Sequence, residues 1–118
     1  MLIAYGAVEA VGYAQAQNLL TIIAPVSGQT ADGTLSFSGK AFVNSITRRG
    51  TISGQTNTGV ECRGTAIVNL TFSHGEGTIV CGQLSSRFVF SLTSRQPVAG
   101  TGAGTLSDGR KVMLRIGQ

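Results

Sequence analysis

Residues 59–93 read GVECRGTAIVNLTFSHGEGTIVCGQLSSRFVFSLT, and they hold both cysteines, the only histidine and three of the five phenylalanines. From 65 to 73 apolar and polar residues alternate, with Leu70 and Phe72 on the apolar side. The run FVF at 88–90 alternates in the same way. A period of two is typical of a strand that buries one face. The stretch therefore predicts antiparallel strands whose phenylalanines form the core.

The first two of these strands should be joined by a turn at 73–76, where the sequence SHGE is polar and contains glycine. A hairpin around this turn places Leu70 opposite Ile79, and Val68 opposite Cys81. This register predicts that Leu70 is a core residue.

The two cysteines test the register. Both have the inward parity, which favours a buried disulfide between Cys62 and Cys81. In the simple hairpin, however, the two lie roughly 20 Å apart along the sheet, and a disulfide requires about 4.4–6.8 Å between α-carbons. Either Gly64 bends the chain, as glycines in strands often do, or the bond is absent. If it forms, we expect a stabilisation of about 3 kcal/mol.

Strand-like runs bounded by turn residues continue through the rest of the chain. The first is expected to end before Pro25, because proline cannot donate to a sheet ladder. Turn signals at 38–39 and 108–109 predict two further hairpins. The second of these hairpins should place Leu106 opposite Val112, so that both are buried.

Short motifs recur at a nearly constant spacing. The sequence VSGQT at 26–30 returns as ISGQT at 52–56, and GEGTI at 75–79 returns as GAGTL at 102–106. The repeats indicate either a decayed duplication of a hairpin unit or the ordinary composition of a glycine-rich β-meander. Together with 17 glycines in 118 residues, they predict one all-β domain at 18–118, a small antiparallel barrel or sandwich built from glycine-rich hairpins.

Residues 1–17 differ from this pattern, because they are rich in alanine and do not alternate. Small residues near position 14 resemble the cleavage site of a secretory signal peptide. No basic residue precedes them, and Glu9 interrupts the apolar run. The segment is therefore either the remnant of a signal peptide or a short N-terminal helix that packs on the sheet. No stretch approaches the roughly 20 apolar residues of a transmembrane helix.

The chain is basic but weakly charged, with a net charge of +4 and 12% charged residues. The cations are scattered along the sequence, which favours a solvated surface over a nucleic-acid footprint. The pair Arg48–Arg49 at a predicted loop tip is the candidate contact for a phosphate or carboxylate.

Catalytic and metal-binding patterns are weak. His74 lies between Cys62 and Cys81, but a structural zinc site generally requires four ligands, and no CxxC spacing occurs. Five carboxylates in the whole chain offer little for paired acid–base chemistry. We therefore expect no enzymatic activity, no metal and no cofactor.

The composition favours a non-catalytic structural or binding module of the bacterial envelope or the extracellular space. Low charge and a pair of inward cysteines are typical of exported domains, so a periplasmic or secreted location is expected. If the thiols are free and the N-terminus is retained, the location is cytoplasmic. The expected partner is a protein, a glycan or an apolar ligand enclosed by the sheet. The alternative is a small basic barrel that binds nucleic acid, although the phenylalanines follow the buried parity rather than an exposed one.

Overall fold

The computed structural model describes residues 20–117, which form a closed barrel of eight antiparallel strands. The strands are β1 (Thr21–Thr30), β2 (Ser36–Asn44), β3 (Arg49–Thr56), β4 (Glu61–Val68), β5 (His74–Cys81), β6 (Leu84–Arg95), β7 (Val98–Leu106) and β8 (Lys111–Ile116). The all-β fold expected from the sequence is confirmed, and of the two architectures left open, barrel and sandwich, the structure is the barrel. The predictions for residues 1–17 lie outside the described residues. The described part of the chain contains no helix long and apolar enough to cross a membrane.

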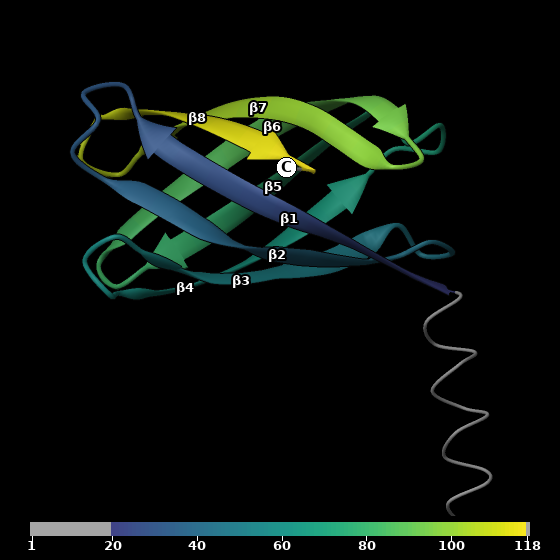
Figure 1. Ribbon diagram of the computed structural model, residues 1–118, viewed down its shortest axis with the longest axis horizontal. Helices are drawn as coiled ribbons and strands as arrows, with labels where there is room; N and C mark the ends of the chain where they lie inside the picture. Colours follow the sequence, from purple (N-terminus) through teal and green to yellow (C-terminus); the bar gives the residue numbers. More distant parts are fainter. Residues whose placement is uncertain (1–19, 118) are drawn as a thin grey trace, which may run out of the picture.

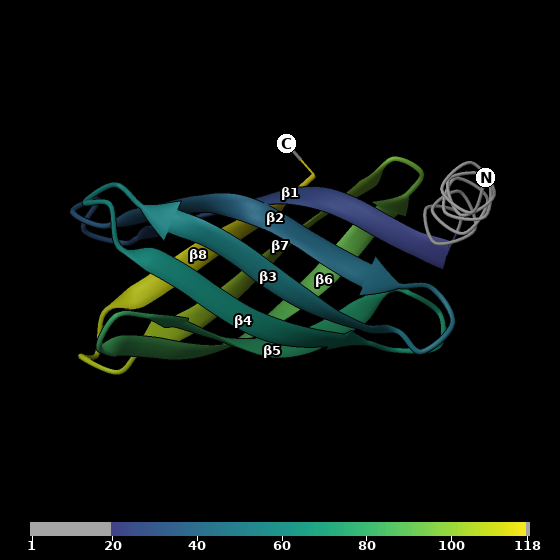
Figure 2. The same cartoon turned by 90° about the horizontal axis from the view of Figure 1, so that it is seen from below.

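Each strand pairs with its neighbours in the sequence, and β8 pairs with β1 to close the sheet (Figures 1 and 2). The turns at 31–35, 57–60, 82–83 and 107–110 gather at one end of the barrel, which we call the disulfide end (Figure 1). The turns at 45–48, 69–73 and 96–97 lie at the opposite end, which we call the Phe72 end. This up-and-down order leaves no unpaired edge strand.

Side chains alternate between the interior and the solvent along every strand, as the burial patterns of β4 to β6 illustrate. The buried core cluster consists of Ile52, Val68, Phe72, Phe88 and Phe90. In a barrel of eight strands the interior is just wide enough to be filled by such side chains or to hold one small ligand. The architecture therefore makes the interior the first place to look for a site.

Glycines of β5 and β7 make room for the two phenylalanines of β6. Phe88 pairs with Gly77 on one side and with Gly104 on the other, while Phe90 pairs with Gly75 and Gly102. A Cβ on Gly77 would lie 2.6 Å from the Phe88 ring. The repeated motifs GEGTI and GAGTL thus lie in β5 and β7, the two strands that flank β6. In both, the glycines leave room for the phenylalanine rings of β6.

The second pair of repeats also occupies equivalent places. The residues VSGQT end β1 and the residues ISGQT end β3, and each strand then enters a turn at the disulfide end. The last residues, Thr30 and Thr56, are buried polar side chains. The Thr30 hydroxyl donates to Asp32 in the following turn at 2.7 Å, and the Thr56 hydroxyl lies 2.9 Å from that of Thr58. Each copy of the repeat therefore ends a strand with a buried threonine whose hydroxyl contacts a side chain of the following turn.

The predicted register of the β4–β5 hairpin is wrong. The turn lies at 69–73, before the position expected, and β4 ends at Val68. Cys62 consequently pairs directly with Cys81, and Gly64 pairs with Ile79 without any bend being needed to join the cysteines. Leu70, expected in the core, lies in the turn and is 79% exposed. Asn69 causes the early turn, because its carboxamide oxygen accepts hydrogen bonds from the backbone N–H groups of Ser73 and His74.

The expected end of the first strand before Pro25 is also wrong, because β1 runs through it to Thr30. The carbonyl of Pro25 accepts a hydrogen bond from the Gly117 N–H, on the side of β8. In an extended strand the nitrogen and the carbonyl of one residue point the same way. The missing N–H of Pro25 therefore points toward β8, away from β2, and costs the β1–β2 ladder no bond.

The turn expected at 38–39 is absent, and the last hairpin has its expected turn at 108–109 but a different register. Gly39 lies inside β2 opposite Gly54, and the ring of Phe37 fills the space that a Cβ on either glycine would need. In the last hairpin the Leu106 N–H bonds to the Arg110 carbonyl, so Leu106 faces Arg110 rather than Val112. At Gly39 close interior packing, rather than the turn propensity of Ser-Gly, decides the structure, whereas the Asp-Gly turn forms where it was predicted and only the register across it differs.

Candidate functional site

The half of the interior toward the Phe72 end contains a small cavity of about 60 Å³, whose wall is apolar apart from Arg95. The wall comes from the strand ends nearest that end of the barrel, and it includes Ile22, Ala24, Val43, Val68, Leu92 and Ile116. Deeper in the barrel, Phe88 and Phe90 line the same cavity. Because the other lining side chains are apolar, the cavity suits an apolar guest rather than water.

Phe72 covers this cavity from the turn at 69–73. Its side chain is buried, although its φ of 56° is unusual for a residue other than glycine. The Phe72 N–H donates to the Asn69 carbonyl, and the Ser73 carbonyl accepts from the Leu92 N–H, which ties the turn to β6. Such a backbone conformation costs about 1–3 kcal/mol, an amount that burial of the ring offsets at about 1.5–3 kcal/mol. The turn therefore holds the Phe72 ring as a plug over the cavity. The two free-energy contributions nearly cancel, so this conformation of the turn adds little to the stability of the fold.

Arg95 lies over the plug. Its guanidinium carbon is 4.6 Å from the centre of the Phe72 ring, and its side chain also lines the cavity. This geometry is a cation–π contact, which contributes about 0.5–1 kcal/mol at an exposed site. Phe72 and Arg95 thus both line the cavity at this end of the barrel and contact each other through their side chains.

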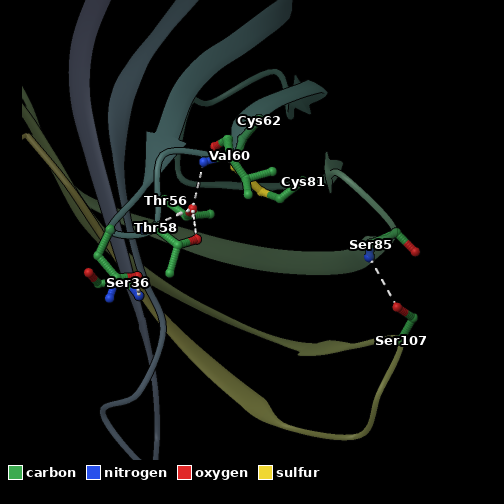
Figure 3. The surroundings of a disulfide bond; sticks show 9 residues. Ser36, Thr56, Thr58, Val60, Cys62, Cys81, Ser85 and Ser107 are labelled. Carbon is green, nitrogen blue, oxygen red and sulfur yellow. Dashed lines mark hydrogen bonds between the residues drawn. A yellow bond between two sulfur atoms is a disulfide. The ribbon is translucent and has the colours of Figure 1, made fainter.

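The opposite end is closed covalently. Cys62 and Cys81 project inward from β4 and β5 and form a disulfide with α-carbons 4.2 Å apart (Figure 3). Cys62 is completely buried. Beside the disulfide, the Thr56 hydroxyl accepts a hydrogen bond from the Val60 N–H at 3.1 Å (Figure 3). The disulfide joins the first inward residue of β4 to the last inward residue of β5, and it fixes this end of the barrel.

The turns at the disulfide end also form a small electrostatic network. Hydrogen bonds from the Thr30 hydroxyl, and from the backbone and hydroxyl of Thr34, lower the pKa of Asp32 to about 2. Arg110 pairs with Asp108 at 2.7 Å and lowers the pKa of that carboxyl by hydrogen bonding. The Arg110 guanidinium also donates to the Thr34 hydroxyl at 3.1 Å, which joins two turns far apart in the sequence.

The two arginines expected to contact an anion lie on different hollows of the outer surface. Arg48 has a φ of 63° and donates from its guanidinium to the Val68 carbonyl at 3.3 Å. It lines a hollow of about 370 Å³, whereas Arg49 lines a neighbouring one of about 590 Å³. They are therefore not a joint clamp, and an anion contact at either stays a prediction.

His74 is exposed at the start of β5, where its Nδ1 lies 2.9 Å from the Ser73 hydroxyl. It lies at the Phe72 end of β5, while the disulfide is at the other end. Within residues 20–117 no three side chains of the His, Cys, Asp and Glu types converge as metal ligands would.

Sequence reasoning identified Cys62 and Cys81 as a pair but missed the cavity and its two covering residues. Phe72 was expected in the core as a strand residue rather than as a plug contributed by a turn. Arg95 carried no signal, since it stands in a polar run, TSRQ at 93–96, that looked like a loop. A readable clue was the series of inward glycines in β5 and β7, at 75, 77, 100, 102 and 104, which add no side chain to the interior.

No protein-family model and no curated protein matches this sequence. Solved structures with a similar fold include designed barrels. A redesigned β-barrel named mFAP1, bound to DFHBI, aligns with a TM-score of 0.64 at 21% identity, covering 87% of this chain and 98% of the other. The related mFAP0, also bound to DFHBI, aligns at 0.62 and 20%, covering 85% and 99%. A de novo designed fluorescence-activating barrel aligns at 0.57 and 20%, covering 87% and 96%. At these identities the likeness shows the fold alone.

Proposed function

We propose that this protein is a non-catalytic, exported binding module that takes one small apolar molecule into the barrel through the Phe72 end. The observation that carries the proposal is the apolar cavity beneath a plug made by Phe72 and Arg95. Ligand sites are typically concave and mostly apolar, and the mouths of β-barrels are a preferred place for them.

The size of the cavity specifies how binding would occur. Ligand pockets typically measure about 300–1,000 Å³, and this cavity measures about 60 Å³. A ligand must therefore displace the Phe72 ring rather than bind beside it. The plug suits this role because it belongs to a turn and has an unfavourable φ. The designed barrels solved with DFHBI support the idea that a barrel of this size accommodates a small molecule.

Export rests on different grounds. The Cys62–Cys81 disulfide favours an oxidising compartment, such as the periplasm or the extracellular space. To test this, cells should be lysed directly into denaturant that contains the alkylating reagent, so that buried thiols are also accessible, followed by measurement of the intact mass. We expect no alkylation at Cys62 or Cys81. Complete alkylation at both would place the protein in a reducing compartment.

The binding proposal is tested with N-phenyl-1-naphthylamine, a neutral probe that fluoresces in apolar surroundings. We expect saturable binding to the wild-type protein. The Ala24→Leu variant, which fills the cavity wall, should bind about tenfold more weakly, equivalent to about 1.4 kcal/mol. The Phe72→Ala variant should bind more tightly, because no plug has to be displaced.

The exposed Leu70 provides the matched control, since Leu70→Ala changes the same turn without touching the cavity. Its affinity for the probe should equal that of the wild type. Non-saturable fluorescence, or an unchanged affinity in Ala24→Leu, would contradict the proposal. Urea unfolding of each variant verifies that all of them are folded under the binding conditions.

The nucleic-acid alternative has less support. Proteins that bind single strands stack bases on exposed aromatic rings. Of the phenylalanines, Phe42 is the exposed one, and it is 38% exposed on the outer face of β2. Retention on an anionic polymer with a steep salt dependence would favour this alternative.

A further inference from the structure

Arg95 reaches the cavity because of an irregularity in β6. Along most of the β6–β7 ladder the register is constant, and Leu92 pairs with Gly100. Beyond Leu92 it shifts, so that Ser94 pairs with Ala99 and Arg95 pairs with Val98. A single extra residue in β6 produces such a bulge, and bulges often re-aim a side chain beside a functional site.

The shift changes which residues of β6 and β7 face each other at the end of the ladder, where Arg95 is exposed. Before the bulge, odd-numbered residues such as Val89 and Ser91 are exposed on the outer face. After the bulge Arg95 is the cross-strand partner of Val98, and both residues line the cavity. The bulge therefore brings a cation to the mouth of an apolar cavity.

This cation has an unusual environment. Arg95 is the one charged side chain among the described residues that line the cavity. The two ion pairs found within residues 20–117, Arg63–Glu61 and Arg110–Asp108, both lie toward the disulfide end. The turns 45–48, 69–73 and 96–97 of the Phe72 end read SITR, NLTFS and QP, with no carboxylate. In the described structure the guanidinium thus contacts an aromatic face, whereas a carboxylate or phosphate would give it the stronger, bidentate partner.

We propose that the ligand is an amphiphile with a single alkyl chain and an anionic head group. Its chain replaces the Phe72 ring in the cavity, and its head pairs with the guanidinium of Arg95. This inference rests on the proposed function, and it adds the class of ligand. A single chain suits the cavity, because Phe88 and Phe90 fill the interior beneath it.

The same contacts couple the head group to the plug. Arg95 holds the Phe72 ring from above in the empty barrel. An anion that pairs with the guanidinium competes with this contact, and the ring is then released from the mouth at the moment when the chain needs the space. An uncharged amphiphile with the same chain lacks this advantage. The anionic head group should therefore raise the affinity in two ways, by pairing with Arg95 and by weakening the contact between Arg95 and Phe72.

The test is displacement of N-phenyl-1-naphthylamine by three amphiphiles with the same chain, all below their micelle concentrations. These are decanoate, decanol and decyltrimethylammonium. For the wild-type protein we expect decanoate to compete at least about tenfold better than decanol, and decyltrimethylammonium to compete least. Decyl phosphate, in a fourth arm, distinguishes a carboxylate from a phosphate head group.

Matched variants assign the preference to Arg95. Arg95→Gln should abolish the advantage of decanoate over decanol, and Arg95→Lys should retain part of it, since a point charge remains. Arg49→Gln removes the same charge from the same end of the barrel but from the outer face, and it should leave the advantage intact.

The outcomes separate the two proposals. If the probe itself does not bind saturably, the proposed function is wrong. If the probe binds and all three amphiphiles displace it equally, the binding function stands and the anionic class is wrong. A decanoate preference that survives in Arg95→Gln, or that disappears in Arg49→Gln, would also overturn the assignment to Arg95.

Discussion

The ring of Phe90 occupies the space that a Cβ on its cross-strand partner Gly75 would take. The same ring is flanked on the other side by Gly102, where a Cβ would lie 2.9 Å from the Phe90 Cβ. A large side chain between two glycines lets neighbouring strands approach while the interior stays filled. The core of this barrel thus contains cross-strand pairs of a phenylalanine and a glycine. A methyl group added to the glycine of such a pair should lower the stability of the barrel.

Gly75→Ala should therefore destabilise the barrel by about 2–3 kcal/mol, the cost of overpacking a filled core. The free energy of unfolding in urea measures the effect. Glu76→Ala, at the next and outward-facing position, is the control and should be nearly neutral. In a Phe90→Leu background the cost of Gly75→Ala should fall by about 1 kcal/mol or more, because the two residues are in contact. Strict additivity of the two substitutions would show that the clash is with the backbone alone.

Periodicity predicted the faces of the strands but not where the strands end. Leu70 and Phe72 have the same parity in the sequence and opposite roles in the structure, because β4 stops at Val68 and Asn69 starts a turn. In a turn, parity no longer determines burial. The alternation of the side chains could therefore identify Phe88 and Phe90 as core residues, whereas the role of Phe72 depends on a backbone conformation that no period encodes.

The candidate site was less predictable than the fold for two physical reasons. A bulge shifts the pairing of a strand by one residue, and this change at the end of β6 pairs the exposed Arg95 with Val98, beside which it lines the cavity. Glycines that read as turn signals, such as Gly39, serve instead as packing surfaces for rings from the same or the next strand. Both effects depend on partners far along the sheet, so the local sequence did not reveal them.

Removing the disulfide should weaken the barrel without abolishing it. A bond between residues 19 apart in sequence contributes about 3 kcal/mol by restricting the unfolded chain. Cys62→Ala/Cys81→Ala should therefore lose about this amount in urea unfolding, and reduced wild-type protein should match the variant. Circular dichroism of the variant should retain its β signature, because Cys62 and Cys81 are also joined by the ladder of β4 and β5. An oxidised protein no more stable than the reduced form would contradict the pairing.

The carboxyl of Asp32 should make stability depend on pH in acid. Its pKa is lowered from 3.8 to about 2 by hydrogen bonds from Thr30 and Thr34, so the folded state favours the carboxylate. This contribution is fully present above about pH 4 and is lost as the pH falls through about 2. The difference in melting temperature between the wild type and Asp32→Asn should shrink over that window.

A direct measurement is the carbon-13 chemical shift of the Asp32 carboxyl during a titration. Thr30→Val removes the largest cause of the shift and should raise the pKa of Asp32 toward its ordinary value. An unchanged titration curve in Thr30→Val would assign the low pKa to Thr34 and Arg110 instead.

Leu70 and Phe72, two residues apart in one turn, give the sharpest contrast in stability. Leu70→Ala should change the free energy of unfolding by no more than about 0.5 kcal/mol, as expected for an exposed side chain without contacts in the core. Phe72→Ala removes a buried ring from the core cluster and should cost about 3 kcal/mol. A neutral amphiphile or probe added in excess should recover part of that loss, because a ligand that occupies the vacated space binds the folded state alone. Equal destabilisation by the two substitutions would mean that Leu70 contributes to the core, as the simple hairpin register predicted.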